Sequence, residues 1–213
     1  MKRNATSKTA PDYSEESILI DKGYSLIAGL DEVGRGTLAG PVVAGVVILP
    51  VNPEYPWVKD IRDSKMLTPK RREHILKDME KDCLAIQTGS ASAAEIDQDG
   101  IVKATRLAME RALKSLPLEP QYLLLDAFPL PEINIPQKAI VKGDVHCLSI
   151  AAASIAAKVF RDKIMVEKDK TYPGYGFASN KGYGTKEHLD QLSKEGPCDI
   201  HRYSFAPIKL DRN

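Results

Sequence analysis

Cysteine is scarce in this sequence, and its placement excludes two common uses. Cys83, Cys147 and Cys198 lie far apart, and no Cys-x-x-Cys pair occurs. Zinc knuckles and disulfide scaffolds both need closely spaced or paired cysteines, so neither is indicated. Reduced thiols are usual in a cytosol, and we expect that location for this protein.

Long hydrophobic runs are also lacking. Residues 1–17 contain no apolar core of the kind that a secretory signal requires. The most apolar later stretch, residues 41–49, is far shorter than the roughly 20 residues of a membrane helix. We therefore expect a soluble, cytoplasmic protein without a membrane partner.

Neither sign of charge is in large excess. The net charge is +1, so no overall field attracts nucleic acid. Basic residues do gather in two local groups, which are Lys65, Lys70, Arg71 and Arg72, and then Lys181, Lys186, His201 and Arg202. Such groups could follow the phosphates of a nucleic acid. Solvated helix faces explain them more often, and we favour that interpretation.

The glycine pattern of a nucleotide-binding loop is incomplete. Gly34, Gly36 and Gly40 have a last spacing that is one residue too long for G-x-G-x-x-G. The sequence also lacks G-x-x-x-x-G-K-[ST]. We expect no nucleotide cofactor.

Hydrophobic periodicity predicts strands and helices along the chain. Strands are expected over residues 25–31, 42–49, 83–91, 122–127 and 138–141. Helices are expected after Thr68, after the capping box that begins at Ser92, over 146–169 and over about 185–195, with Gly100 dividing the pattern of 92–116 in two. Residues 1 to about 15 are expected to be loosely attached, and 173–184 to form a loop.

The lengths of the connections predict a mixed sheet flanked by helices. Short connections between the early strands are typical of antiparallel neighbours, and helical connections between the later strands are typical of parallel ones. If the first and fourth strands are parallel neighbours, Asp31 and Asp126 lie at the same end of the sheet. That end is the usual ligand site of open α/β sheets.

Four carboxylates are candidates for a metal site: Asp31, Glu32, Asp126 and Asp144. Carboxylates brought together repel one another unless a cation is present. Hard oxygen ligands suit Mg²⁺ or Mn²⁺. A pair of such ions can activate a water and stabilise the leaving oxygen of a phosphodiester.

Simpler explanations compete with the metal site. Adjacent strand residues such as Asp31 and Glu32 point to opposite faces unless the strand ends or kinks there. Asp144 could merely cap a helix. Asp126 is the hardest to dismiss, because it follows three leucines, where an unpaired charge would be costly.

Aromatic and histidine residues give weaker signals. Tyr183 lies between two glycines, and an exposed aromatic there could stack on a sugar or base, although it could equally be a core residue. His146 and His188 are expected on helix surfaces. No Ser-His-Asp or Cys-His arrangement can be assembled from the spacing.

Six separated motifs follow one another along residues 25–208. They are GLDEVGRGTLAGPVVAGVVIL, DSKMLTPKRRE, DAFPLP, KGDVHCLSIAAASIAAKVFRD, YGFASNKGYGTKEH and HRYSFAP. Together they resemble the type 2 ribonucleases H, in particular bacterial ribonuclease HII. The resemblance implies an α/β, RNase H-like fold with a five-stranded mixed sheet in the order 3-2-1-4-5, flanked by helices. It also implies a partly disordered N-terminal extension over 1–24 and a catalytic domain over 25–213, with a C-terminal helical extension from about 172.

The same resemblance implies an endoribonuclease that depends on Mg²⁺ or Mn²⁺, with two ions when substrate is bound. Such an enzyme cleaves the RNA of RNA–DNA hybrids and incises DNA 5′ of single embedded ribonucleotides, a step of ribonucleotide excision repair, leaving 3′-OH and 5′-phosphate ends. These nucleic acids would be its partners, and we expect a monomer. The resemblance makes Asp31, Glu32, Asp126 and Asp144 the catalytic, metal-binding acids. It places Gly34, Arg35 and Gly36 against the ribose, Tyr183 on the adjoining deoxyribose, and Lys65 near the substrate backbone.

Two details depart from the family pattern. Thr37 stands where proline is commoner, and DAFPLP replaces the frequent Asp-Gly after the fourth strand, but neither removes a ligand. The related ribonuclease HIII has an extra N-terminal domain, whereas only about 24 residues precede the core here. Two other functions stay open, an RNase H-like DNA nuclease of the resolvase type and a non-catalytic nucleic-acid-binding module.

Overall fold

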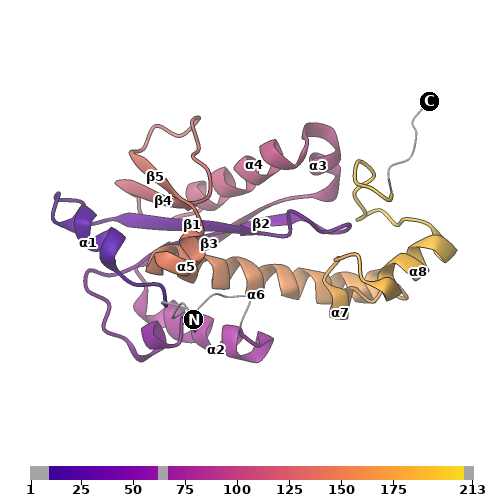
Figure 1. Ribbon diagram of the computed structural model, residues 1–213, viewed down its shortest axis with the longest axis horizontal. Helices are drawn as coiled ribbons and strands as arrows, with labels where there is room; N and C mark the ends of the chain where they lie inside the picture. Colours follow the sequence, from indigo (N-terminus) through magenta and orange to yellow (C-terminus); the bar gives the residue numbers. More distant parts are fainter. Residues whose placement is uncertain (1–9, 62–66, 209–213) are drawn as a thin grey trace, which may run out of the picture.

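A twisted mixed sheet forms the centre of the molecule (Figure 1). The computed structural model describes residues 10–61 and 67–208, and within them the sheet has five strands in the order β3-β2-β1-β4-β5. The expected order 3-2-1-4-5 is therefore confirmed. The strands are β1 (Ile27–Val33), β2 (Val42–Ile48), β3 (Ala85–Ala91), β4 (Tyr122–Asp126) and β5 (Gln137–Ile140).

Helices cover both faces of this sheet (Figure 1). One face carries α3 (Ala93–Asp99) and α4 (Ile101–Lys114), and the other carries the long α6 (Leu148–Thr171) with α2 (Pro69–Asp82) outside it. The remaining elements are α1 (Ser14–Ile20), η1 (Pro56–Lys59), α5 (Gly143–His146), α7 (Phe177–Asn180) and α8 (Lys186–Glu195). No helix in the described ranges has the length and apolar character to span a bilayer.

The predicted helix starts are confirmed by their caps. Thr68 Oγ1 accepts a hydrogen bond from Arg71 N, with Pro69 in the first turn of α2. Ser92 and Glu95 form the expected capping box of α3. Gly100, with φ of +80°, separates α3 from α4, a backbone conformation that glycine adopts without steric cost.

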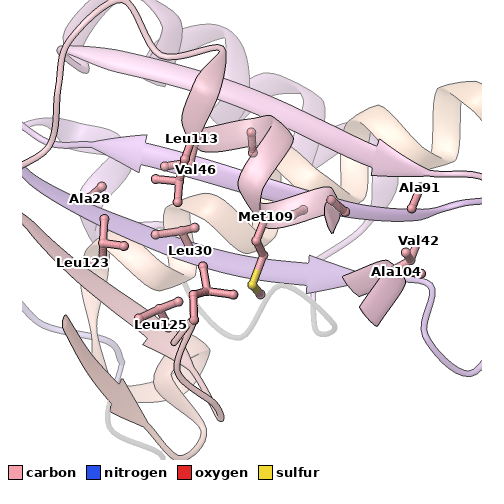
Figure 2. Packing of buried hydrophobic residues seen from close by; sticks show 14 of the residues in the cluster. Ala28, Leu30, Val42, Val46, Ala91, Ala104, Met109, Leu113, Leu123 and Leu125 are labelled. Carbon is pink, nitrogen blue, oxygen red and sulfur yellow. The ribbon is translucent and has the colours of Figure 1, made fainter. Parts of the chain in front are cut away.

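Two apolar layers hold the sheet between the helices. Figure 2 shows the layer between the sheet and α4, in which Leu30 and Leu125 face Met109. On the opposite face, small residues let α6 lie close to the strands, because a Cβ on Gly45 would overlap the Ala153 carbonyl. The alanine-rich sequence of α6 is thus explained by its close approach to the sheet.

The N-terminal segment and two short helices depart from the expectation. Asp12 pairs with Cys147 through backbone hydrogen bonds, so the attached part of the chain begins before residue 15. The stretch 173–184 contains the short helix α7, and α5 precedes the long helix. Short helices of this size carry too few residues to produce a periodic pattern.

Candidate active site

Four acidic side chains from three elements line one pocket. Asp31 and Glu32 come from β1, Asp126 from the last position of β4, and Asp144 from α5. The pocket has a volume of about 180 Å³, and its other lining residues are Val33, Ser154, Lys158 and Tyr183. We refer to it as the acid pocket. The predicted convergence of the four acids is therefore present in the structure.

The strand register brings Asp31 and Asp126 together. Strands β1 and β4 are parallel, with Leu30 opposite Leu125, so the next residue on each strand is an aspartate. Strand β4 ends at Asp126, whereas β1 continues to Val33. Because no β4 residue lies beside Glu32, both neighbouring acids of β1 can border the same opening.

Electrostatic repulsion is built into this pocket. Asp31 is only 5% exposed, and burial together with the nearby Glu32 and Asp126 carboxylates raises its pKa well above the usual value. Burial also raises the pKa of Glu32, although Arg35 partly offsets the shift. Within the described residues, Glu32 Oε2 is buried without a hydrogen-bond partner.

A divalent cation would relieve this repulsion, so the donor chemistry of the pocket fits Mg²⁺ or Mn²⁺. Carboxylate oxygens are the ligands that these ions prefer, and the unpartnered Glu32 oxygen offers a free lone pair. Among residues 10–61 and 67–208, no three acidic, histidine or cysteine side chains form a ready-made metal cluster.

The segment after β5 fixes Asp126 and carries Asp144. Gly143 N donates a hydrogen bond of 2.8 Å to Asp126 Oδ1. Asp144 is the next residue, lies within α5 and is 5% exposed. The N-cap of α6 is Cys147, so Asp144 does not cap the long helix as the simpler explanation proposed.

The two glycines beside the acid pocket differ in what they permit. Gly34 has a φ of +89°, and a Cβ there would overlap the Arg161 side chain. Nothing lies within 4 Å of a Cβ built on Gly36. The backbone at Gly36 is thus open to a close-approaching ligand, whereas Gly34 is required by the loop itself. Between them, Arg35 Nη1 lies 3.2 Å from Glu32 Oε1.

Two buried arginines hold this glycine loop, residues 34–41. Arg202 is fully buried and donates to the carbonyls of Gly34, Arg35 and Gly40 at 2.6–3.1 Å. Arg161 donates to the carbonyls of Ala39 and Pro41 and to Thr37 Oγ1. The interpretation of Arg202 as part of a solvated face was therefore wrong, and a phosphate contact is excluded by its burial.

Sequence reasoning missed these arginines for different reasons. Arg161 follows Ala153 and Ala157 at intervals of four residues, which places it on the buried stripe of α6, and that spacing was an available signal. Arg202 lies in an irregular segment with no periodicity. Of the other basic residues in the two groups, Arg72 and His201 are also buried, and Lys181 is half-buried. Lys70, Arg71 and Lys186 are exposed. Lys65 lies outside the described residues.

Tyr183 is exposed at the rim of the acid pocket. Its exposed fraction is 43%, which excludes the core role, and Lys158 Nζ lies 5.8 Å from its ring centroid. A carbonyl only accepts, so His188 Nδ1 donates to Tyr183 O at 2.8 Å. His188 Nε2 must then accept from His201 Nε2 at 3.0 Å, and His201 Nδ1 accepts from Cys198 N.

This chain of hydrogen bonds requires both imidazoles to be neutral. His188 is fully buried, so its expected place on a helix surface was wrong. Burial lowers the pKa of His188, and burial together with His188 lowers the pKa of His201 to about 4. A proton added to either ring would place two N–H groups against each other. The hydrogen bond between the two rings, which orients the His188 donor toward Tyr183 O, therefore forms only when both imidazoles are neutral.

We expect the contribution of the histidine pair to the free energy of unfolding to decrease as the pH falls. Because the folded pKa of His201 is about 4 and the unfolded value is about 6.5, the unfolded chain binds more protons within this window. The contribution is complete above pH 6.5 and is lost progressively toward pH 4. His201→Gln keeps one donor and one acceptor but does not titrate. Urea unfolding at pH 7 and pH 5 should show a smaller loss of stability in this variant than in the wild type, and equal losses would contradict the expectation.

Comparisons of the sequence with known proteins point to one family. The sequence profile of the family described as Ribonuclease HII matches residues 28–208. A ribonuclease HII of Dehalococcoides mccartyi is 50% identical over 199 residues, 93% of this chain and 94% of that protein. One from Thermus thermophilus is 52% identical over 183 residues, 86% of this chain and 87% of that protein.

Two solved structures resemble the fold of this chain. The ribonuclease H2 of Pyrococcus horikoshii has a TM-score of 0.69 and 25% identity, covering 85% of this chain and 94% of that one. A structure described as Bst-RNase HIII in complex with Mn²⁺ has a TM-score of 0.68 at 18% identity, covering 98% of this chain and 76% of that one. At that identity the second likeness concerns the fold alone.

Proposed function

The chain belongs to the ribonuclease HII family, and we propose that it is a metal-dependent endoribonuclease that cleaves the RNA strand of RNA–DNA hybrids and incises DNA 5′ of single embedded ribonucleotides. The observation that carries this proposal is the acid pocket itself. Four acids from distant segments share it with Tyr183, directly beside a glycine loop with one open position. In this proposal the acids bind metal at the phosphate of the substrate, and the glycine loop contacts its sugar.

The acids are proposed to hold Mg²⁺ or Mn²⁺, with two ions when substrate is bound. Asp31, Glu32, Asp126 and Asp144 are the ligands in this proposal. Bound divalent ions would activate a water and stabilise the departing 3′ oxygen, which gives 3′-OH and 5′-phosphate ends. Ser154 supports the arrangement, because its side chain donates to Asp31 and favours the ionised carboxylate.

The glycine loop is proposed to distinguish ribose from deoxyribose. The open backbone at Gly36 admits close contact with a sugar, and the 2′-OH is the group that separates RNA from DNA at a given position. The Arg35 guanidinium pairs with Glu32, and its Cζ lies 5.2 Å from the Phe128 ring centroid. The Arg35 backbone is held by the hydrogen bond that its carbonyl accepts from Arg202. We also propose that Lys65 binds near the backbone of the substrate. The protein is proposed to act as a monomer in the cytoplasm.

The decisive experiment is cleavage of a DNA duplex that contains one ribonucleotide. We expect Mg²⁺-dependent incision on the 5′ side of that residue, with 3′-OH and 5′-phosphate ends and no product in the presence of a chelator. Branched DNA is tested alongside, since its preferential cleavage would indicate a resolvase. Binding of the duplex without any product would indicate a non-catalytic module.

Replacing Tyr183 tests the proposed contact with the deoxyribose. Tyr183→Ala removes an exposed ring, so the melting temperature should change little. Incision at a single ribonucleotide should fall about tenfold or more, given the usual contribution of aromatic stacking. Tyr183→Phe keeps the ring and should behave as wild type. A parallel loss of stability and incision in Tyr183→Ala would mean that the ring serves the fold.

A further inference from the structure

Helix α1 places a buried carboxylate against the start of α6. Glu16 is 1% exposed, and its Oε1 accepts a hydrogen bond of 2.7 Å from Ser149 N. The Cys147 thiol donates to the same oxygen at 3.1 Å, and burial keeps this thiol protonated by raising its pKa. The two segments are more than a hundred residues apart in the sequence.

Glu16 therefore acts as the cap of a helix to which it does not belong. Helix α6 begins after Cys147, which provides no side-chain cap of its own. The first amide groups of a helix need acceptors, and a carboxylate also complements the positive end of the helix dipole. Glu16 supplies both at Ser149. The backbone of Asp12 adds a second link, accepting a hydrogen bond of 2.9 Å from Leu148 N.

The capped segment adjoins the turn that carries Asp144, one of the four acids of the pocket. Cys147 N donates to Gly143 O at 2.8 Å, closing the turn around Asp144. Gly143 N in turn donates to Asp126 Oδ1 at 2.8 Å. A shift at residue 147 is thus passed to two acids of the pocket, one on α5 and one on β4.

The capped segment also packs directly against β1. A Cβ on Gly29 would overlap the Ser149 backbone and hydroxyl, so Ser149 lies in direct contact with the strand two residues before Asp31. Glu16 fixes the amide of this same serine. The contact ties α1 to a third acid of the pocket.

Stability alone does not explain a carboxylate at this position. Glu16 Oε2 has no hydrogen-bond partner among the described residues, and burial raises the pKa of the group. Burying a carboxylate with one oxygen unpartnered costs folding free energy, which the hydrogen bonds to Oε1 offset only in part.

We propose that Glu16 is a positioning residue for the acid pocket, which fixes Asp144 and Asp126 through the turn at residues 143–149 and so sets the affinity for divalent metal. The inference rests on the proposed metal site. Residues that orient metal ligands commonly change metal affinity by about 10- to 100-fold when they are replaced. Glu16 is not proposed as a ligand, because it does not line the acid pocket and its described side-chain hydrogen bonds are those with Cys147 and Ser149.

The test is direct titration of the folded protein with Mn²⁺ alone, followed by the electron paramagnetic resonance signal of free Mn²⁺. We expect Glu16→Ala to raise the dissociation constant about tenfold. Glu16→Gln keeps the acceptor for Ser149 N and should stay within about threefold of wild type. If Glu16→Ala does not fold, Glu16→Asp, which withdraws the carboxylate by one methylene, should weaken binding at least threefold.

Two controls separate positioning from general loosening. Ile75→Ala removes a buried apolar side chain of α2, away from the turn, and should lower the melting temperature without changing Mn²⁺ affinity. Glu15→Ala removes the ion pair of α1 with Lys138 and should leave both unchanged. Wild-type Mn²⁺ affinity in folded Glu16→Ala or Glu16→Asp, or an equal loss in Ile75→Ala, would overturn the inference. If the wild type does not bind Mn²⁺, or Asp126→Asn binds it equally well, the proposed metal site fails instead.

Discussion

Asp126→Asn should abolish cleavage while leaving the fold and substrate binding largely intact. The asparagine oxygen can still accept the hydrogen bond from Gly143 N, so the turn that carries Asp144 keeps its support. The loss of charge removes one proposed metal ligand, and a metal ion supplies several kcal/mol of transition-state stabilisation. We expect single-turnover cleavage of a duplex with one ribonucleotide to fall at least about a thousandfold.

Asp78→Asn is the matched control for this variant. Asp78 lies on α2, where it pairs only with exposed side chains, and its loss should leave the rate unchanged. Binding of the uncleaved duplex, measured by fluorescence anisotropy, should be similar in all three proteins. Near-normal turnover of Asp126→Asn would count decisively against the proposed chemistry.

Arg202→Ala should cause a large loss of stability. The carbonyls of Arg35 and Gly40 lose their Arg202 donors, whereas Gly34 O keeps the hydrogen bond from Thr37 Oγ1, and each unsatisfied acceptor costs about 1 kcal/mol or more. The free energy of unfolding should therefore fall by at least about 2 kcal/mol, which for a chain of this size lowers the melting temperature by roughly 4–8 °C. Differential scanning calorimetry measures this shift.

Arg71→Ala provides the comparison, because Arg71 makes an exposed ion pair with Asp60. Pairs of this kind contribute at most about 1 kcal/mol, so this variant should melt close to the wild type. The pKa of Arg202 is lowered by burial and by Arg161, yet the guanidinium stays charged at neutral pH. Equal melting of Arg202→Ala and Arg71→Ala would contradict the assignment of Arg202 as the support of the loop.

Short sequence patterns predict much of this fold, because its strands and helix caps depend on residues only a few positions apart. The apolar run Leu123–Leu125 followed by an acid predicts both a buried strand and a charge at its end. The caps at Thr68 and Ser92 depend only on residues three positions away. Connection lengths allow β1 and β4 to be parallel neighbours but do not require it, and the expected strand order came from the family resemblance. The pairing that the structure shows brings Asp31 and Asp126 together.

The supporting residues were not predictable in the same way. The burial of Arg202 depends on carbonyls more than 160 positions earlier in the chain. The burial of Glu16 depends on an amide at Ser149, and that of His188 on a partner at His201. A charged or polar side chain is buried only when distant groups satisfy it, and nothing in the neighbouring sequence announces those groups.

The glycine loop near the start of the fold is held by side chains from residues 161 and 202. A ribosome delivers these arginines more than a hundred residues after the loop itself. Strands and acids can assemble on the growing chain, but the loop cannot settle until both arginines have emerged. Under the proposed function, recognition of the ribose therefore waits for the segment that carries residue 202.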